Sequence, residues 1–234
     1  MTRRGTDWEE LARDRPYYRL LTEEGLVEVE SSAAATSAFL ETGEADLSRL
    51  LSAVASIIAH DLALTTALDF GCGVGRLTLP LARRADTVFA CDIAPTMLEH
   101  VRQNAESAGL RNITPIGNDH LAAMPDGSFR FVCSLLVFQY IPPAAGREVI
   151  RTLLRLLAPG GIAVLQVTLA PRRDALRRLA ALSRRWSRGI ETYRYDLSAI
   201  ENAVESADAR IVGRLPMQGS DMLIIEKGPE LSGP

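Results

Sequence analysis

The segment Asp69-Phe70-Gly71-Cys72-Gly73-Val74-Gly75-Arg76 contains the most informative pattern in this sequence. It follows a short apolar run, Thr65–Phe70, and leads into a stretch with helical character, Gly75–Arg84. Glycines at alternate positions permit a tight turn between a strand and a helix, and they let a ligand approach the backbone closely. The segment therefore predicts a strand, a ligand-binding turn and a helix within an α/β domain.

Two residues beside the glycines distinguish this turn from a dinucleotide-binding loop. The dinucleotide fingerprint, G-x-G-x-x-G, would place a third glycine where this chain has Arg76. Asp69 stands two positions before the first glycine, and its carboxylate would repel a diphosphate. The same carboxylate would attract a ligand that carries an ammonium and a sulfonium group. These residues disfavour an NAD-dependent oxidoreductase.

Polar residues also follow the next two predicted strands. Asp92 ends the run Thr87–Asp92, about twenty residues beyond the glycines, and this spacing suits a carboxylate that binds ribose hydroxyls. Gly117-Asn118-Asp119-His120 follows the run Asn112–Gly117. Because α/β proteins bind ligands outside the carboxyl ends of their strands, side chains here could recognise an adenine amino group.

On either side of this region the chain alternates apolar runs with amphipathic helical stretches, which predicts a parallel sheet with right-handed crossovers. The last two strands have no helix between them and should pair antiparallel. The further predicted strands are Phe129–Val137, Ile162–Leu169, Ala209–Leu215 and Met222–Glu226, and the further predicted helices are Asp7–Asp14, Gly43–Ala59, Pro95–Ala108, Pro143–Leu157 and Asp196–Ser206. Residues 1–60 should form an N-terminal helical extension, and residues 61–234 the ligand-binding domain.

Composition restricts the possible classes of protein. The 234 residues are 47 % hydrophobic and carry a net charge of −3, which fits a globular protein and does not indicate stable nucleic-acid binding. No apolar run reaches the ~18 residues of a membrane span, and Met1–Glu10 is polar, so a cytoplasmic location is expected. Cys72, Cys91 and Cys133 have no CxxC spacing, so buried thiols are expected and no metal site is indicated.

Four motifs in order resemble the class I S-adenosylmethionine-dependent methyltransferases, of the bacterial small-molecule type. They are Leu68–Thr78, Cys91–Leu98, Pro125–Phe129 and Leu157–Gly161, within roughly residues 60–170. The resemblance implies a Rossmann-like α/β fold, whose seven-stranded, mostly parallel sheet has the order 3-2-1-4-5-7-6 with strand 7 antiparallel. It also implies S-adenosyl-L-methionine as cofactor and S-adenosyl-L-homocysteine as product.

The resemblance assigns cofactor-binding roles by position. The glycine turn would hold the methionine part, Asp92 the ribose, and Ile93 and Met97 the adenine, whereas the adenine amino group could bind either Asn118 or Asp119. In many relatives an N-terminal extension covers the cofactor, where a tyrosine such as Tyr18 can contact the methionine carboxylate. The full candidate set is Asp69, Gly71, Cys72, Gly73, Gly75, Arg76, Asp92, Ile93, Met97, Asn118, Asp119, His120, Leu135 and Tyr18.

Candidate catalytic residues are fewer, because the family keeps no single catalytic side chain. Gln139 and Tyr140 follow the fourth strand, beside the expected position of the sulfonium, and could orient an acceptor. Neither is a strong base, and a role in loop packing remains open for both. His120 is a conceivable base, although it follows the adenine loop.

The stretch of about residues 171–194 contains eight arginines, including Arg177, Arg178, Arg184 and Arg185, against only Asp174 and one glutamate. Leucines at helical spacing predict a basic amphipathic helix inserted here. It could be a solvated helix, a lid that recognises a phosphate, carboxylate or nucleotide-linked sugar, or a docking element for anionic membrane or RNA.

These patterns predict an enzyme that methylates an oxygen or nitrogen of a small molecule, such as a sugar or a specialised metabolite. The acceptor could be anionic or nucleotide-linked. An RNA methyltransferase and a non-catalytic cofactor-binding partner subunit are the alternatives. The (N/D/S)-P-P-(Y/F) signature of amino-methylating nucleic-acid enzymes is absent after the fourth strand, at Leu136–Tyr140. The oligomeric state, including a homodimer, stays open.

Overall fold

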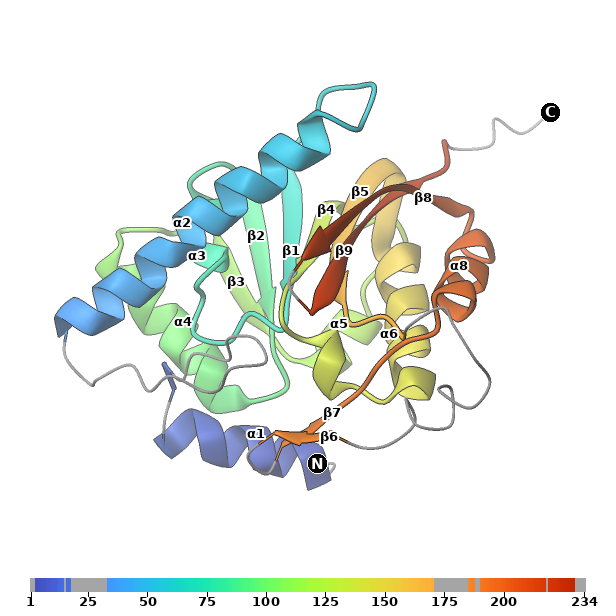
Figure 1. The fold of residues 1–234 in the computed structure, drawn as a ribbon. Helices are drawn as coiled ribbons and strands as arrows, with labels where there is room; N and C mark the ends of the chain where they lie inside the picture. The colour runs from blue at the N-terminus through green and yellow to red at the C-terminus, as the bar shows by residue number, and fades with distance from the viewer. Residues whose placement is uncertain are drawn as a thin grey trace.

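A seven-stranded sheet forms the centre of the molecule (Figure 1). The computed structural model describes residues 3–14, 16–17, 33–170, 185–187, 190–217 and 219–229. The strand order is β3-β2-β1-β4-β5-β9-β8, which in chain order is 3-2-1-4-5-7-6 as predicted. The strands are β1 (Thr66–Phe70), β2 (Thr87–Cys91), β3 (Ile113–Ile116), β4 (Phe129–Ser134), β5 (Leu157–Val167), β8 (Ala209–Met217) and β9 (Ser220–Lys227).

The pairing of these strands confirms the predicted topology. Strands β1 to β5 pair in parallel, whereas β9 is antiparallel to both β5 and β8. All the parallel strands therefore end at one edge of the sheet, here called the carboxyl edge, and the turn after β1 lies there.

Helices cover both faces of the sheet and make three layers. The core cluster on one face includes residues of α2 (Ala33–Ala55) and α3 (Thr78–Ala82), and α4 (Pro95–Ser107) packs beside it on Ala90. The cluster on the other face includes residues of α5 (Asn118–Ala122), α6 (Pro143–Leu156) and α8 (Leu197–Glu205). Helix α1 (Arg3–Asp14) lies beyond the carboxyl edge, next to α4 (Figure 1).

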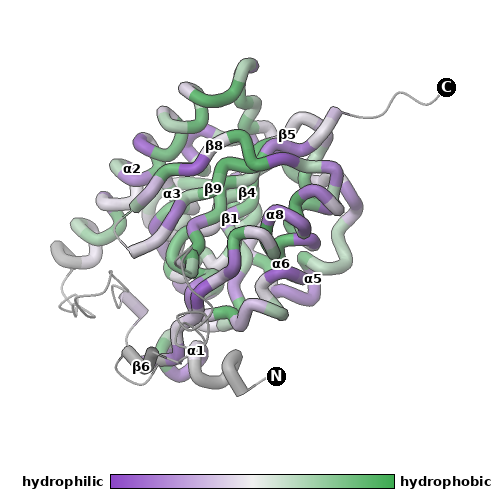
Figure 2. The backbone as a smooth tube through the Cα atoms, turned by 45° about the vertical axis from the view of Figure 1, so that its right-hand side comes forward, coloured by the Kyte–Doolittle hydropathy of each residue, from purple (hydrophilic) through white to green (hydrophobic). Residues whose placement is uncertain are grey.

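The central strands are buried on both faces because successive side chains point to opposite sides. In β5, Ala163 and Leu165 belong to one core cluster, and Ile162 and Val164 belong to the other. Figure 2 shows this as hydrophobic colour along the central strands. Strand β5 is therefore buried on both faces, as is usual for a parallel strand covered by helices on each side.

Helix α2 differs from its predicted range, Gly43–Ala59, because it begins ten residues earlier and ends at Ala55. Gly43 suggests a helix start, yet it lies in the middle of α2. A Cβ at Gly43 would lie 1.8 Å from the carbonyl oxygen of Arg76, so a glycine allows the helix to cross the chain closely. Side chains of helix α2 thus belong to the core cluster on one face of the sheet.

The Arg-rich stretch is not helical at its carboxyl end, which corrects the prediction there. Strands β6 (Arg185–Ser187) and β7 (Ile190–Thr192) pair antiparallel in a separate two-stranded sheet. Aromatic and β-branched residues are frequent in this part of the chain and favour strands over helix. Residues 171–184 and 188–189 of that predicted stretch lie outside the described residues.

Smaller differences concern the ends of elements. Helix α3 starts at Thr78, not Gly75, because positive φ angles at the glycines prevent an earlier start. The predicted loop 117–120 contains the start of α5, and β5 begins at Leu157, before the glycines that were expected to separate helix and strand. Among the described residues, no helix has the length and apolar character needed to cross a membrane.

Candidate functional site

The turn after β1 is held by backbone hydrogen bonds to the neighbouring strand. Gly71 N–H and Cys72 N–H both donate to the Cys91 carbonyl, at 2.8 and 3.0 Å. Gly71, Gly73 and Gly75 have φ angles of 75°, 53° and 93°. Because other residues rarely adopt these angles, the alternate glycines produce this turn.

The glycines also control the space around the turn. A Cβ at Gly71 would lie 2.2 Å from Val137 Cγ2, so the segment after β4 packs directly on this glycine. A Cβ at Gly73 would have no heavy atom within 4 Å. The backbone of the turn is therefore closed at Gly71 and open at Gly73, where a ligand could approach.

Asp92 connects the turn to the end of β2. Its Oδ2 accepts the Gly73 N–H at 2.9 Å, and its Oδ1 accepts the Ala94 N–H at 3.0 Å. Burial raises the pKa of the Asp92 carboxyl, and these backbone hydrogen bonds oppose the shift. The carboxylate is thus fixed in orientation and retains lone pairs for a ligand's hydroxyl groups.

Asp69 lies beneath the turn and is 2 % exposed. Its Oδ2 accepts a hydrogen bond from Thr78 Oγ1 at 2.6 Å, and its Oδ1 accepts a contact from the Cys133 thiol at 3.8 Å. Burial raises the pKa of Asp69 to about 6, whereas the Thr78 hydroxyl and the charge of Arg76 lower it. The nearby carboxylate of Asp92 adds to the increase.

Helix α1 is attached to this edge by polar and aromatic contacts. Glu9 is 7 % exposed and accepts hydrogen bonds from Thr96 Oγ1 at 2.5 Å and Thr96 N–H at 3.1 Å. The rings of Trp8 and Tyr140 meet edge to face, with centroids 5.1 Å apart. Met97 packs in the same small cluster as Trp8. Helix α1 therefore bridges the start of α4 and the segment after β4.

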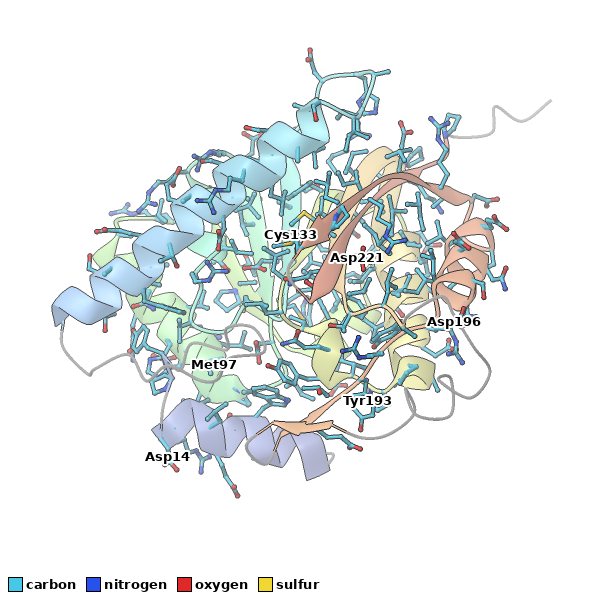
Figure 3. All side chains as sticks on the ribbon, viewed as in Figure 1. Asp14, Met97, Cys133, Tyr193, Asp196 and Asp221 are labelled. Atoms are coloured by element: carbon cyan, nitrogen blue, oxygen red, sulfur yellow. The ribbon has the colours of Figure 1, made fainter. Side chains whose placement is uncertain are left out.

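The segment after β4 contains a short helix, η1 (Phe138–Tyr140), which is held from the other side by residues after β7. Tyr193 N–H donates to the Gln139 carbonyl at 2.7 Å. The buried Tyr195 hydroxyl donates toward the carbonyl of Ile141, at 2.7 Å. Figure 3 shows Met97 and Tyr193 toward the end of the sheet at which α1 lies.

Comparison with known proteins agrees with this arrangement. Residues 67–161 match a family model described as a methyltransferase domain. The ubiquinone biosynthesis O-methyltransferase of Caulobacter sp. (strain K31) is 35 % identical over 98 residues, which are 42 % of this chain and 38 % of that protein. The matched part thus spans less than half the length of this curated relative.

Solved structures show the same fold at low sequence identity. The magnesium protoporphyrin IX methyltransferase of Synechocystis PCC 6803, with bound S-adenosylhomocysteine, superposes with a TM-score of 0.61. It is 20 % identical, and the superposition covers 95 % of this chain and 99 % of that one. The [4+2]-cyclase SpnF gives a TM-score of 0.59 at 17 % identity, over 77 % and 80 % of the two chains. Fold alone therefore leaves the reaction open.

Residues 67–161 therefore match the methyltransferase-domain family, and the chain shares its fold with solved S-adenosylmethionine-dependent methyltransferases. The residues at the carboxyl edge fit the cofactor of that family. The carboxylate of the half-buried Asp92 raises the pKa of the buried Asp69, so a ligand with positive charge would favour the ionised form of Asp69. Buried cysteines nearby, Cys72 and Cys91, have raised pKa values because of burial and these carboxylates, and stay neutral thiols.

Several predicted residues of this methyltransferase domain lie on the β2 and β3 side of the turn. Ile93 is 40 % exposed at the end of β2. Asn118, Asp119 and His120 are exposed on α5 after β3, where Asn118 Oδ1 accepts the Cys91 thiol at 3.2 Å. Strands β3 and β4 lie on opposite sides of β1, although Leu121 of α5 and Phe138 of η1 belong to the same core cluster.

Other predicted residues are engaged with the protein itself. Arg76 turns to α2, where its guanidinium contacts Asp46 at 2.5 Å and Thr42 Oγ1 at 3.3 Å. Leu135 packs against the α2-side core cluster. Tyr18 lies outside the described residues. The structure thus gives Arg76 an ion-pair partner in α2, and its role as a cofactor ligand stays a prediction.

Sequence reasoning misses several residues that shape this edge. Thr78 hydrogen-bonds the buried Asp69, and Glu9 contacts a residue 87 positions away. Gln166 is a buried polar residue within the apolar strand β5, and this contrast is the sequence signal that could have identified it. Within the described parts of the chain, no cluster of three His, Cys, Asp or Glu side chains could hold a metal.

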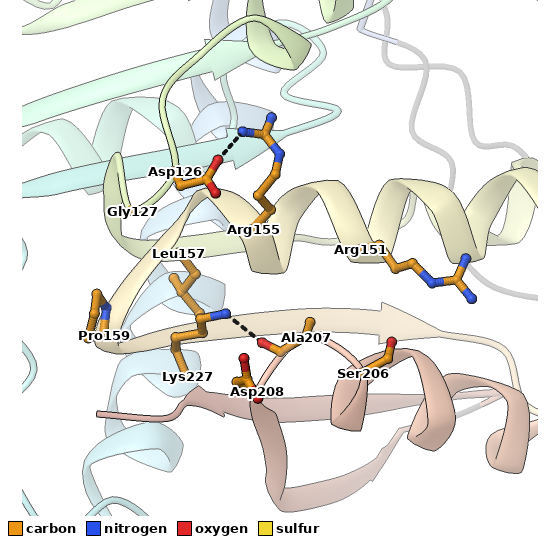
Figure 4. Close-up of a pocket in the computed structure, with 10 residues that line it drawn as sticks. All are labelled: Asp126, Gly127, Arg151, Arg155, Leu157, Pro159, Ser206, Ala207, Asp208 and Lys227. Atoms are coloured by element: carbon orange, nitrogen blue, oxygen red, sulfur yellow. Dashed lines mark hydrogen bonds and ion pairs between the residues drawn. The ribbon is translucent and has the colours of Figure 1, made fainter. Parts of the chain in front are cut away.

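A hollow of about 580 Å³ lies at the opposite edge of the sheet, near the starts of β4 and β5. Its charged lining side chains are largely paired within the protein, as Figure 4 shows for Arg155 with Asp126 and Lys227 with the Ala207 carbonyl. It lies away from the glycine turn.

Proposed function

We propose that this protein transfers the methyl group of S-adenosylmethionine to an oxygen of a small molecule. The observation that carries the proposal is the glycine turn, where the open Gly73 backbone donates a hydrogen bond to the half-buried, fixed carboxylate of Asp92. The curated relatives named as O-methyltransferases support oxygen as the target atom.

The nucleoside would bind on the β2 and β3 side of the turn. Asp92 would accept hydrogen bonds from the ribose hydroxyls through its remaining lone pairs. The exposed Ile93 would cover the adenine ring, and Asn118 or Asp119 would bind the adenine amino group. Met97 would support this surface from beneath α1.

The methionine part would bind at the glycine turn. The backbone of Gly71, Cys72, Gly73 and Gly75 would provide its surface. Because Asp69 lies beneath the turn, with Thr78 and Cys133 on its oxygens, its charge would act on the cationic ligand through the turn.

The acceptor would bind beside the segment after β4. S-adenosylmethionine supplies an electrophilic methyl group on a positively charged sulfur. An acceptor hydroxyl must lie in line with that methyl group and away from bulk water. Gln139 and Tyr140 would orient it, and the contact of Tyr140 with Trp8 makes a flat, partly apolar acceptor more suitable than an open-chain polar one.

Calorimetry with S-adenosylmethionine and S-adenosylhomocysteine tests the cofactor assignment. Asp92→Ala should weaken binding by about 10- to 100-fold, because it removes charged hydrogen bonds to backbone and ribose. Asp86→Ala is the matched control, since Asp86 is exposed at the other end of the same strand. No binding to the wild-type protein at millimolar ligand would refute the proposal.

Turnover tests the reaction itself. Formation of S-adenosylhomocysteine should depend on an added acceptor, tested with a set of phenols, such as catechol, and free sugars. Methylation of phenols but not sugars would support a flat acceptor. Cofactor binding without turnover on any small molecule or RNA would instead favour a non-catalytic partner subunit.

A further inference from the structure

Leu136, two residues after β4, has a backbone conformation that leucine rarely adopts. Its φ angle is 61°. Among the described residues, Leu136 and Asp208 are the two residues other than glycine that have a positive φ. A bulky side chain in this left-handed region is strained, and such strain persists only where the surrounding structure imposes it.

Gln166 of β5 is the residue that holds Leu136. Its Oε1 accepts the Leu136 N–H at 3.1 Å, and its Nε2 donates to Ser220 Oγ at 2.8 Å. Gln166 is 7 % exposed, and its strand neighbours Leu165 and Val167 are apolar and buried. Both ends of its amide are therefore used to connect the segment after β4 with β5 and the start of β9.

The segment that follows Leu136 forms one wall of the proposed methyl-transfer site. The next residue, Val137, packs on Gly71 so closely that no Cβ would fit there. Gln139 and Tyr140 follow in η1. Because φ at Leu136 sets the direction in which the chain leaves β4, it determines where Val137 and η1 lie relative to the glycine turn.

We propose that Gln166 is a positioning residue for methyl transfer: it holds Leu136 in the left-handed conformation that places Val137 against Gly71 and η1 beside the acceptor. The inference rests on the proposed function. An amide suits this task because its carbonyl accepts a backbone N–H while its NH₂ group donates elsewhere, without a buried charge. Gln166 acts through Leu136 and has no direct contact with the reacting atoms.

Gln166→Leu tests the proposal because leucine keeps apolar volume and removes both hydrogen bonds. Hydrogen exchange of amides 136–140 should become faster. The kcat for whichever phenol or sugar the wild type methylates should fall roughly 10- to 100-fold, whereas the Kd for S-adenosylhomocysteine should change little. Ser220→Ala is the matched control, since it removes the outer hydrogen bond and leaves the Leu136 bond intact.

Two further variants separate positioning from general stability. Gln166→Glu keeps oxygens that accept from Leu136 N–H and Ser220 Oγ, so it should retain slow exchange and most of kcat even if the melting temperature falls. In the Gln166→Leu background, Leu136→Gly should restore part of kcat, because glycine adopts the left-handed conformation without strain.

If Gln166→Leu kept the wild-type kcat and the wild-type hydrogen-exchange rates of amides 136–140, the positioning role of Gln166 would be refuted and the proposed function would stand. A Gln166→Glu variant as impaired as Gln166→Leu, together with no rescue by Leu136→Gly, would also refute the positioning role, because that result would assign Gln166 a packing role. Failure of the wild-type protein to bind S-adenosylhomocysteine would refute the proposed function instead.

Discussion

Gly71 shows how one position can satisfy two requirements at once. Its φ of 75° favours glycine, and Val137 occupies the space that a Cβ would need. Gly109 has a similar φ of 69° but open space around it. The first requirement is visible in the sequence as a glycine pattern, whereas the second arises from a residue 66 positions away.

Asp69 is the second residue whose environment matters for function. Its folded-state pKa of about 6 lies above the ordinary value of 3.8. The folded protein therefore holds a proton here that the unfolded chain has lost, and this contribution to stability is present below pH 3.8 and lost as the pH rises through about 6.

The affinity for the cationic cofactor should depend on pH in the opposite direction. Ionised Asp69 attracts positive charge, so S-adenosylmethionine should bind more tightly at pH 7 than at pH 5, with at most a tenfold change per pH unit for one proton. Asp69→Asn keeps an acceptor for Thr78 and should flatten this dependence. Calorimetry of both proteins from pH 5 to 8 is the measurement, and parallel pH profiles would contradict the assignment.

At the scale of elements, short contacts attach α1 and η1 to the sheet. Glu9 links α1 to the start of α4, and burial, which would raise its pKa, is outweighed by the Thr96 hydrogen bonds and Arg13, which lower it. On the other side, the Tyr193 N–H donates to the Gln139 carbonyl of η1, and the Tyr195 hydroxyl donates toward the Phe138 carbonyl. Helix α1, η1 and the residues after β7 thus come together at the carboxyl edge from distant parts of the chain.

Removal of the Glu9 carboxylate should detach α1. In Glu9→Ala the Thr96 N–H and hydroxyl lose their partner, at a cost of about 1–3 kcal/mol. Hydrogen exchange of residues 3–14 should become faster, and the affinity for S-adenosylhomocysteine should fall if α1 covers the cofactor. Glu10→Ala, at an exposed neighbouring position, is the control. Unchanged exchange in Glu9→Ala would show that other contacts hold α1.

At the scale of the whole molecule, α2 forms part of the helical layer that covers one face of the sheet. Leu47, Leu50 and Val54 enter the core cluster on one face of the sheet. Arg76, directly after the glycine turn, pairs with Asp46 of α2. One arginine therefore joins the outer layer to the loop that shapes the site.

Arg76→Met should destabilise the fold and leave cofactor affinity largely intact. The Arg76 side chain is 16 % exposed and Asp46 is 37 % exposed, so the loss should be about 1–2 kcal/mol, below that of a fully buried pair. The melting temperature should fall by about 2–4 °C per kcal/mol. Arg83→Met is the control, since Arg83 is 51 % exposed and lies 3.8 Å from Glu44. A large loss of affinity at an unchanged melting temperature would assign Arg76 to the cofactor.

Prediction from sequence succeeds here where the signal is local. The alternating apolar runs identify all seven strands of the large sheet. The lack of a helical stretch between the last two predicted strands identifies the antiparallel pairing at that end of the sheet. It fails where tertiary contacts override local preference. Gly43 resembles a helix start and lies within α2, and the Arg-rich stretch resembles a helix but ends in the β6–β7 pair.

The glycine turn, Asp69 and Asp92 were identifiable from the sequence by itself, because positive-φ glycines and charges at strand ends are properties of a few consecutive residues. The tertiary structure decided how these residues are used. It turned Arg76 toward α2, placed Asp69 beneath the turn and brought Gln166 to the backbone of Leu136. These partners lie 9 to 30 positions apart in the chain, so the packing of strands and helices, and no short sequence pattern, brings them within hydrogen-bonding distance.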